Sequence, residues 1–91
     1  MSKAATRQAY IRASVQYYGF IESNALVEIF GIPQEQALAE IKAMQPELGL
    51  TYSRQDSAWC ARPATDVESV KAAFNVIASV QKTFIDKGEK A

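Results

Sequence analysis

Apolar residues at helical spacing predict that the chain begins with a helix from about Lys3 to Tyr18. Gly19 follows where a helix-ending glycine is expected, because glycine adopts the left-handed backbone conformation at low cost. The apolar positions that carry this pattern are Ala4, Ile11, Val15 and Tyr18. We therefore predict one continuous helix here, followed by a short apolar link at 20–21.

Two further helical patterns follow, separated by a tight turn. Ser23 or Asn24 can cap the first of them, and Gly31 stops it. The next helix opens at Pro33, since proline is tolerated in the first turn of a helix. The residues predicted to break this third helix are Pro46 and Gly49.

Residues 50–54 and 58–62 carry alternating apolar side chains and flank a polar turn at 55–57. Alternation on both sides of a short turn is typical of a β-hairpin, so we predict two antiparallel strands before Pro63. Thr65 and Glu68 then have the spacing of a capping box, in which the two side chains satisfy each other's backbone amides. A long helix is predicted to follow.

The predicted last helix carries a stripe at spacings of three and four residues, which we call the tail seam. Its positions are Val67, Val70, Phe74, Ile77, Gln81 and Phe84. Such a stripe can fold back onto the same chain or pair with a second chain, and the small area of the preceding elements favours a homodimer. We therefore divide the chain into a head, 1–63, and a C-terminal dimerisation helix, 64–91.

Composition narrows the chemistry that the protein can perform. The 91 residues contain no histidine, which removes the commonest general base and the commonest metal ligand. The four glycines are scattered singly and form no phosphate-binding loop. Cys60 is the one cysteine, so no disulfide can form within the chain. We expect a protein that is not an enzyme and that needs neither a metal nor a cofactor.

Charge cancels over the whole chain but not locally. Ten basic and ten acidic residues give a net charge of zero, while residues 1–21 hold three basic residues and no acid. Residues 22–50, by contrast, hold five glutamates against Lys42. A neutral total is unusual for a nucleic-acid-binding protein. No apolar run approaches the roughly 18 residues that span a bilayer, so we expect a soluble, cytoplasmic protein without a membrane partner.

The order of the predicted elements is helix, short helix, glycine-containing turn, helix and hairpin, which is that of a winged helix-turn-helix. The expected fold is therefore mainly α with a small β-hairpin: a winged helix-turn-helix plus a C-terminal amphipathic dimerisation helix. The residues that carry a more specific likeness are Leu26, Phe30-Gly31-Ile32-Pro33, Gln36-Ala37, Glu40-Ile41, Leu50-Thr51-Tyr52 and Trp59.

With these residues the chain resembles winged helix-turn-helix transcription regulators, most closely the N-terminal domain of WYL-domain repressors associated with phage defence and more loosely the DeoR family. The resemblance covers roughly residues 7–63. It departs from the family pattern at Pro33, which replaces a serine, and at Leu38 and Ala39, where polar or basic side chains are common. The resemblance implies that the third helix enters a DNA major groove while the hairpin lies along the backbone.

The candidate DNA-contacting residues lie on the third helix, at the hairpin tip and on the first helix. Glutamine can pair with adenine, and lysine or arginine can neutralise phosphate; each of these side chains can equally belong to an ordinary solvated face. The candidates are Gln34, Glu35, Gln36, Leu38, Ala39, Lys42, Arg54, Gln55, Arg7 and Arg12.

Two functions remain open from the sequence. The first is a DNA-binding transcription regulator of bacterial or phage origin, a homodimeric repressor that binds double-stranded DNA at a palindromic operator. The second is a protein-interaction module on the same fold, an antirepressor or assembly subunit, which the neutral charge and the Leu38-Ala39 pair favour.

Overall fold

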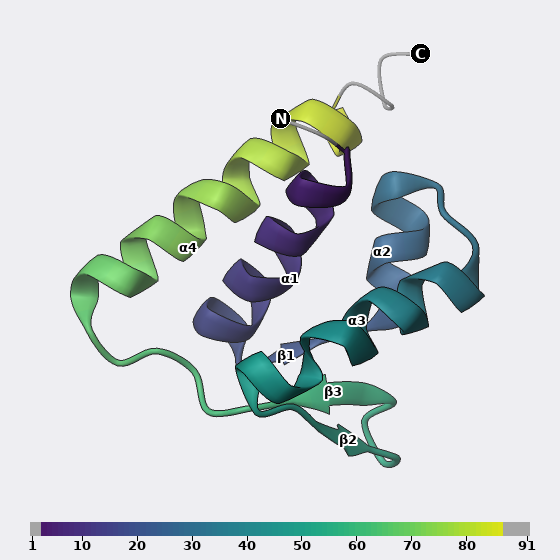
Figure 1. The fold of residues 1–91 in the computed structure, drawn as a ribbon. Coiled ribbons are helices and arrows are strands. Elements are labelled where there is room, and N and C mark those ends of the chain that lie inside the picture. The colour runs from purple at the N-terminus through teal and green to yellow at the C-terminus, as the bar shows by residue number, and fades with distance from the viewer. Residues whose placement is uncertain (1–2, 87–91) are drawn as a thin grey trace.

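The computed structural model describes residues 3–86 and is mainly helical, with one small antiparallel sheet (Figure 1). The predicted fold class, mainly α with a small hairpin, is confirmed. The elements in chain order are α1 (Lys3–Tyr18), β1 (Phe20–Ile21), α2 (Ser23–Phe30), α3 (Gln34–Leu48), β2 (Thr51–Ser53), β3 (Ala58–Cys60), α4 (Val67–Val80) and a π-helical turn, η1 (Gln81–Asp86).

The first helix ends as its sequence predicts. The amide of Gly19 donates to the carbonyl of Val15 at 2.9 Å, and Gly19 has a φ of +85°. A Cβ at Gly19 would lie 3.2 Å from the carbonyl oxygen of Ala61 and 3.3 Å from Cδ of Pro63. This position therefore needs glycine both for its backbone conformation and for the close passage of the chain that leaves β3.

The short apolar link after α1 is a strand. β1 pairs antiparallel with β3, with Phe20 opposite Cys60 and Ile21 opposite Trp59, so the sheet has three strands in the order β1-β3-β2. Two residues are too few for an alternating pattern, and only the partner strand reveals this element. The predicted hairpin is confirmed, with shorter strands than expected and Tyr52 opposite Trp59.

The turn between α2 and α3 has the predicted glycine, but the predicted caps are wrong. Gly31 has a φ of +68° and donates to the carbonyl of Val27 at 2.9 Å. The N-cap of α2 is Glu22, which makes no side-chain capping bond. Ser23 instead lies inside the helix, where its hydroxyl accepts a hydrogen bond from Gln34 at 2.7 Å. This bond ties the first turns of α2 and α3 together.

The third helix is longer than predicted because Pro46 does not end it. α3 continues through Pro46 to Leu48, and Gly49 ends it with a φ of +66°. A proline costs one amide donor and pushes against the preceding turn; here the helix accepts that loss within three residues of its end. At the other end Pro33 is the N-cap rather than a helical residue, and its carbonyl accepts from the amide of Ala37 at 3.0 Å.

The last helix folds back along the first. α4 lies beside α1, which separates it from α2 and α3 (Figure 1). Its N-cap is Asp66, whose carboxylate accepts from the amide of Ser69 at 2.9 Å, so the predicted Thr65–Glu68 capping box is wrong. The same hydrogen bonding from Ser69 lowers the pKa of Asp66.

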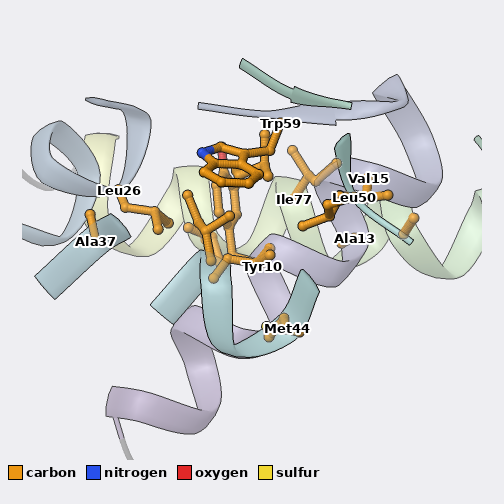
Figure 2. Close-up of a cluster of buried hydrophobic side chains, with 14 residues drawn as sticks. Tyr10, Ala13, Val15, Leu26, Ala37, Met44, Leu50, Trp59 and Ile77 are labelled. Carbon is orange, nitrogen blue, oxygen red and sulfur yellow. The ribbon is translucent and has the colours of Figure 1, made fainter. Parts of the chain in front are cut away.

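One hydrophobic cluster joins the four α-helices to β1 and β3, and Figure 2 shows its side chains. The ring of Trp59 covers it from the sheet, and Ile77 enters it from α4. Its fully buried large side chains are Ile11, Leu26 and Ile41. The head and the tail helix therefore share a core, and that shared core fixes the orientation of α3.

Candidate nucleic-acid interface

The third helix has one buried face and one exposed face. Ala37, Ile41 and Met44 point into the core. The small side chain of Ala37, which is completely buried, lets α3 lie close to its neighbours. The exposed predicted site residues of this helix are Gln34, Glu35, Gln36, Ala39 and Lys42, and Leu38 is half-buried. The outer side of α3 is therefore open to a partner over its first nine residues.

A groove of about 710 Å³ runs between α3 and the hairpin. Gln34, Leu38 and Lys42 form its wall on α3, at spacings of four residues that place them along one line of the helix. Tyr52 and Trp59 form the opposite wall. The structure thus brings three of the predicted residues together in one concave surface.

The hairpin wall of the groove is formed by two rings that pack against each other. Tyr52 and Trp59 are cross-strand partners, and their ring centroids lie 5.0 Å apart at 54°. Trp59 is 8% exposed, and its indole N–H is buried with no hydrogen-bond partner in the described part of the chain. Figure 2 shows this nitrogen turned toward the side on which Leu26 and Ala37 lie. Trp59 is the one tryptophan of the chain, so its fluorescence can report binding in the groove.

The hairpin tip presents Arg54 and Gln55 to solvent. The turn that carries them is fastened by Ser53, whose hydroxyl bonds to the carboxylate of Asp56 at 3.1 Å. Neither tip residue lines the groove. They extend the exposed surface beyond it along the hairpin.

The two arginines of the first helix lie elsewhere and are paired. Nε of Arg7 donates to both carboxylate oxygens of Glu40, at 2.8 and 2.9 Å, and the two side chains are only 11% and 20% exposed. Arg12 donates to Glu47 at 2.7 Å in a more exposed pair. Both glutamates lie on the side of α3 away from the groove. The structure therefore does not bring Arg7 and Arg12 together with Lys42.

These pairs also set the titration of Glu40. Burial would raise the pKa of its carboxyl, but hydrogen bonds from Arg7 and Gln36 and the charge of Arg7 outweigh burial and lower the pKa. The acid-free start of the sequence consequently carries little free positive charge in the folded protein. Glu40 and Glu47, two of the acids that make 22–50 negative, neutralise it.

Several groove residues were missed from the sequence. Glu22, Ser23 and Asn24 line the groove from the start of α2, and Ser57 lines it from the hairpin. Periodicity gives no signal for them, because the groove forms only once the pairing of β1 with β3 brings the start of α2 beside the hairpin. Ser57 has a φ of +52°, a local feature of the turn that sequence alone does not mark.

The tail seam divides into buried and exposed residues. Ile77 is 2% exposed within the chain, and Phe84 packs on Phe30 with ring centroids 4.9 Å apart. Val67 and Phe74 are 65% and 51% exposed. Of the other two, Val70 is half-buried and Gln81 exposed. The inner part of the seam thus packs on the chain's own head.

Within residues 3–86 no three metal-binding side chains cluster, and no helix there is long and apolar enough to cross a membrane. No protein-family model matches the chain, and a comparison with curated proteins found no match. What the groove and the outer face of α3 do must therefore be inferred from their own chemistry.

Proposed function

We infer that the protein is a winged helix-turn-helix DNA-binding transcription regulator that acts as a homodimer. The observation that carries this proposal is the exposed outer face of α3, fixed beside a hairpin after a tight turn at Gly31. A helix of this kind fits the major groove of B-DNA, and a hairpin beside it can follow the phosphate backbone.

The side chains of α3 supply base and phosphate contacts. The amide of Gln34 can pair with the N6 and N7 atoms of adenine, and Ala39 can contact a thymine methyl group. Lys42 lies two turns after Gln34 and has no ion-pair partner among residues 3–86, so it is available to a phosphate. Arg54 extends the phosphate contacts along the hairpin.

The electrostatic contribution of one copy is small. Arg7 and Arg12 are already neutralised, and Glu22 lies in the groove itself. Since phosphate neutralisation supplies most of the sequence-independent affinity, a single copy should bind weakly. Two copies on one duplex combine their binding free energies through a high effective concentration, so a homodimer compensates for the weak binding of one copy.

A mobility-shift assay with the DNA upstream of the protein's own gene tests the proposal. We expect a shift at low salt that weakens at higher salt, together with a change in Trp59 fluorescence. Gln34→Ala combined with Lys42→Ala should abolish the shift, whereas Lys82→Ala, which changes an exposed lysine on η1, should leave it intact. Absence of any shift at low salt would remove DNA binding from consideration.

A protein-interaction module is the second candidate, and one feature of the groove favours it. The exposed ring of Tyr52 and the side chain of Leu38 line an apolar strip between charges of both signs, Glu22 and Lys42. Such a surface suits an amphipathic peptide. A stoichiometric partner that survives in the Lys42→Ala variant, with no response to DNA, would select this function.

A further inference from the structure

Four half-exposed rings form a continuous surface where α1, β1 and α4 meet. We call it the aromatic surface: Tyr17, Tyr18, Phe20 and Phe74. The ring centroids of Phe74 and Tyr17 lie 5.7 Å apart, those of Tyr17 and Tyr18 5.0 Å, and those of Tyr18 and Phe20 5.8 Å. Residues from three separate elements thus assemble into one row of rings.

The aromatic surface exposes a large apolar area to solvent. A ring side chain buries about 150–250 Å² when fully covered, so exposures of 39%, 47%, 40% and 51% leave roughly 350 Å² of ring surface in solvent. This approaches half of the roughly 800 Å² that each partner contributes to a standard protein interface. Val67, two turns before Phe74 on the same face of α4 and 65% exposed, enlarges it.

The fold itself does not require these rings to be apolar. α4 is held on α1 by Ala73, Ile77 and Val80, which are all nearly completely buried. Phe74 is exposed on the same helix, and its ring lies at a tilt of 44° against Tyr17, which is itself exposed and is not part of the core cluster. An exposed apolar row that the core does not need indicates a contact with another molecule.

Charge favours a second copy of this chain as that molecule. The chain has a net charge of zero, so two copies do not repel each other at long range. The exposed α4 residues beside the rings carry both signs, with Lys71 between Val67 and Phe74 and Glu68 next to it. A two-fold axis brings the same patch of both copies together, so the basic side chain at the edge of one copy can face the acidic side chain at the edge of the other.

We propose that the aromatic surface is the homodimer interface of this protein, and that two copies join through it rather than through the buried part of the tail seam. This builds on the proposed homodimer and does not depend on DNA binding.

Sedimentation equilibrium of the full chain over about 1–100 µM tests the interface, in the affinity range of modest dimers. We expect a dimer. Phe74→Asp and Tyr18→Asp should each raise its dissociation constant about 30-fold or more, as removal of a central aromatic side chain does in other interfaces. Tyr52→Asp is the matched control: it removes a ring that is 45% exposed but lies outside the surface, and it should stay dimeric.

Circular dichroism of each variant establishes that it is folded. A wild-type chain that is monomeric at the highest concentration overturns the proposal, and so does a dimer that persists in folded Phe74→Asp and Tyr18→Asp. Failure of the DNA-binding proposal would give a different result. The wild-type protein would then be a dimer that does not shift DNA, and Phe74→Asp would still weaken its association.

Discussion

The ion pair between Arg7 and Glu40 determines how much positive charge α1 can offer. The sequence places three basic residues and no acid in 1–21, and this pattern predicts a basic face. In the fold, the acids of α3 lie directly against it, at 2.8 Å for Arg7 and 2.7 Å for Arg12. Local charge counts cannot reveal such pairing, because the partners are more than 30 residues apart along the chain.

Glu40→Gln should destabilise the protein by about 1–3 kcal/mol, because it removes a charged acceptor from a largely buried guanidinium. Urea unfolding measures this. Glu47→Gln is the control, since its partner Arg12 and Glu47 itself are 42% and 56% exposed, and exposed pairs contribute about 0–1 kcal/mol. Equal effects of the two substitutions would contradict the burial difference.

Acidic pH should lower the free energy of unfolding through protonation of the Glu40 carboxyl. The pKa of Glu40 in the fold is below its ordinary value of 4.5, so its ionised form is stabilised by folding. This contribution is present in full above pH 4.5 and is lost as the pH falls through the lowered pKa. Urea midpoints measured between neutral pH and acid should therefore fall less for Glu40→Gln than for the wild type. Parallel curves would show that Glu40 does not contribute.

Glu22 is the acid that should oppose DNA, because it lines the groove beside Lys42. Glu22→Gln removes this repulsion and should tighten binding to a duplex, as measured by Trp59 fluorescence. Glu28→Gln changes the net charge equally but lies on α2 outside the groove, and it should have a smaller effect. If both substitutions tighten binding to the same extent, total charge and not the groove controls affinity.

At the scale of the elements, the sequence predicts most helix ends but not every cap or strand. Gly19, Gly31 and Gly49 mark three ends correctly, since each adopts a positive φ that other residues avoid. Pro46 misleads because a helix can absorb a proline close to its end. β1 is invisible before folding because its hydrogen bonds are made with β3, some 40 residues further along the chain.

Two of these glycines should respond differently to alanine. Gly31→Ala should destabilise the fold by about 1–2 kcal/mol, which is the cost of holding a residue other than glycine in the left-handed conformation. The added Cβ would have no neighbour within 4 Å, so no steric clash adds to this cost. Gly19→Ala should cost more, since its Cβ would also meet Ala61 and Pro63 at 3.2–3.3 Å. Thermal unfolding of both variants checks the order, and a costlier Gly31→Ala would contradict it.

At the scale of the whole molecule, part of the tail seam is covered by the chain's own helices. Its periodicity correctly marks an amphipathic helix, yet periodicity cannot say which body lies against the apolar stripe. α1 lies along α4 and covers Ile77, and Phe30 of α2 packs on Phe84, while Phe74 is left exposed. The groove was similarly beyond prediction: Gln34, Leu38 and Lys42 were identified, but their opposite wall required the three-stranded sheet.

Substitutions in the tail seam distinguish packing of α4 on its own chain from packing of α4 on a second chain. Ile77→Ala should destabilise the folded chain by about 2–5 kcal/mol, as expected for a buried isoleucine. Val67→Ala should change stability by about 0.5 kcal/mol or less, because Val67 is exposed. Unfolding at a protein concentration low enough to keep the chain monomeric separates these effects from dimerisation. Comparable losses at both positions would argue against α4 lying on α1.

The salt dependence of duplex binding tests most directly whether the outer face of α3 meets DNA. In an anisotropy titration with a labelled duplex between about 50 and 200 mM salt, the logarithm of affinity should fall linearly with the logarithm of salt concentration. Lys42→Ala should reduce that slope by about one, as loss of a single phosphate contact does, and Lys82→Ala on η1 should leave it unchanged. A wild-type protein that does not bind at about 50 mM salt, or a slope that Lys42→Ala leaves untouched, would contradict the account.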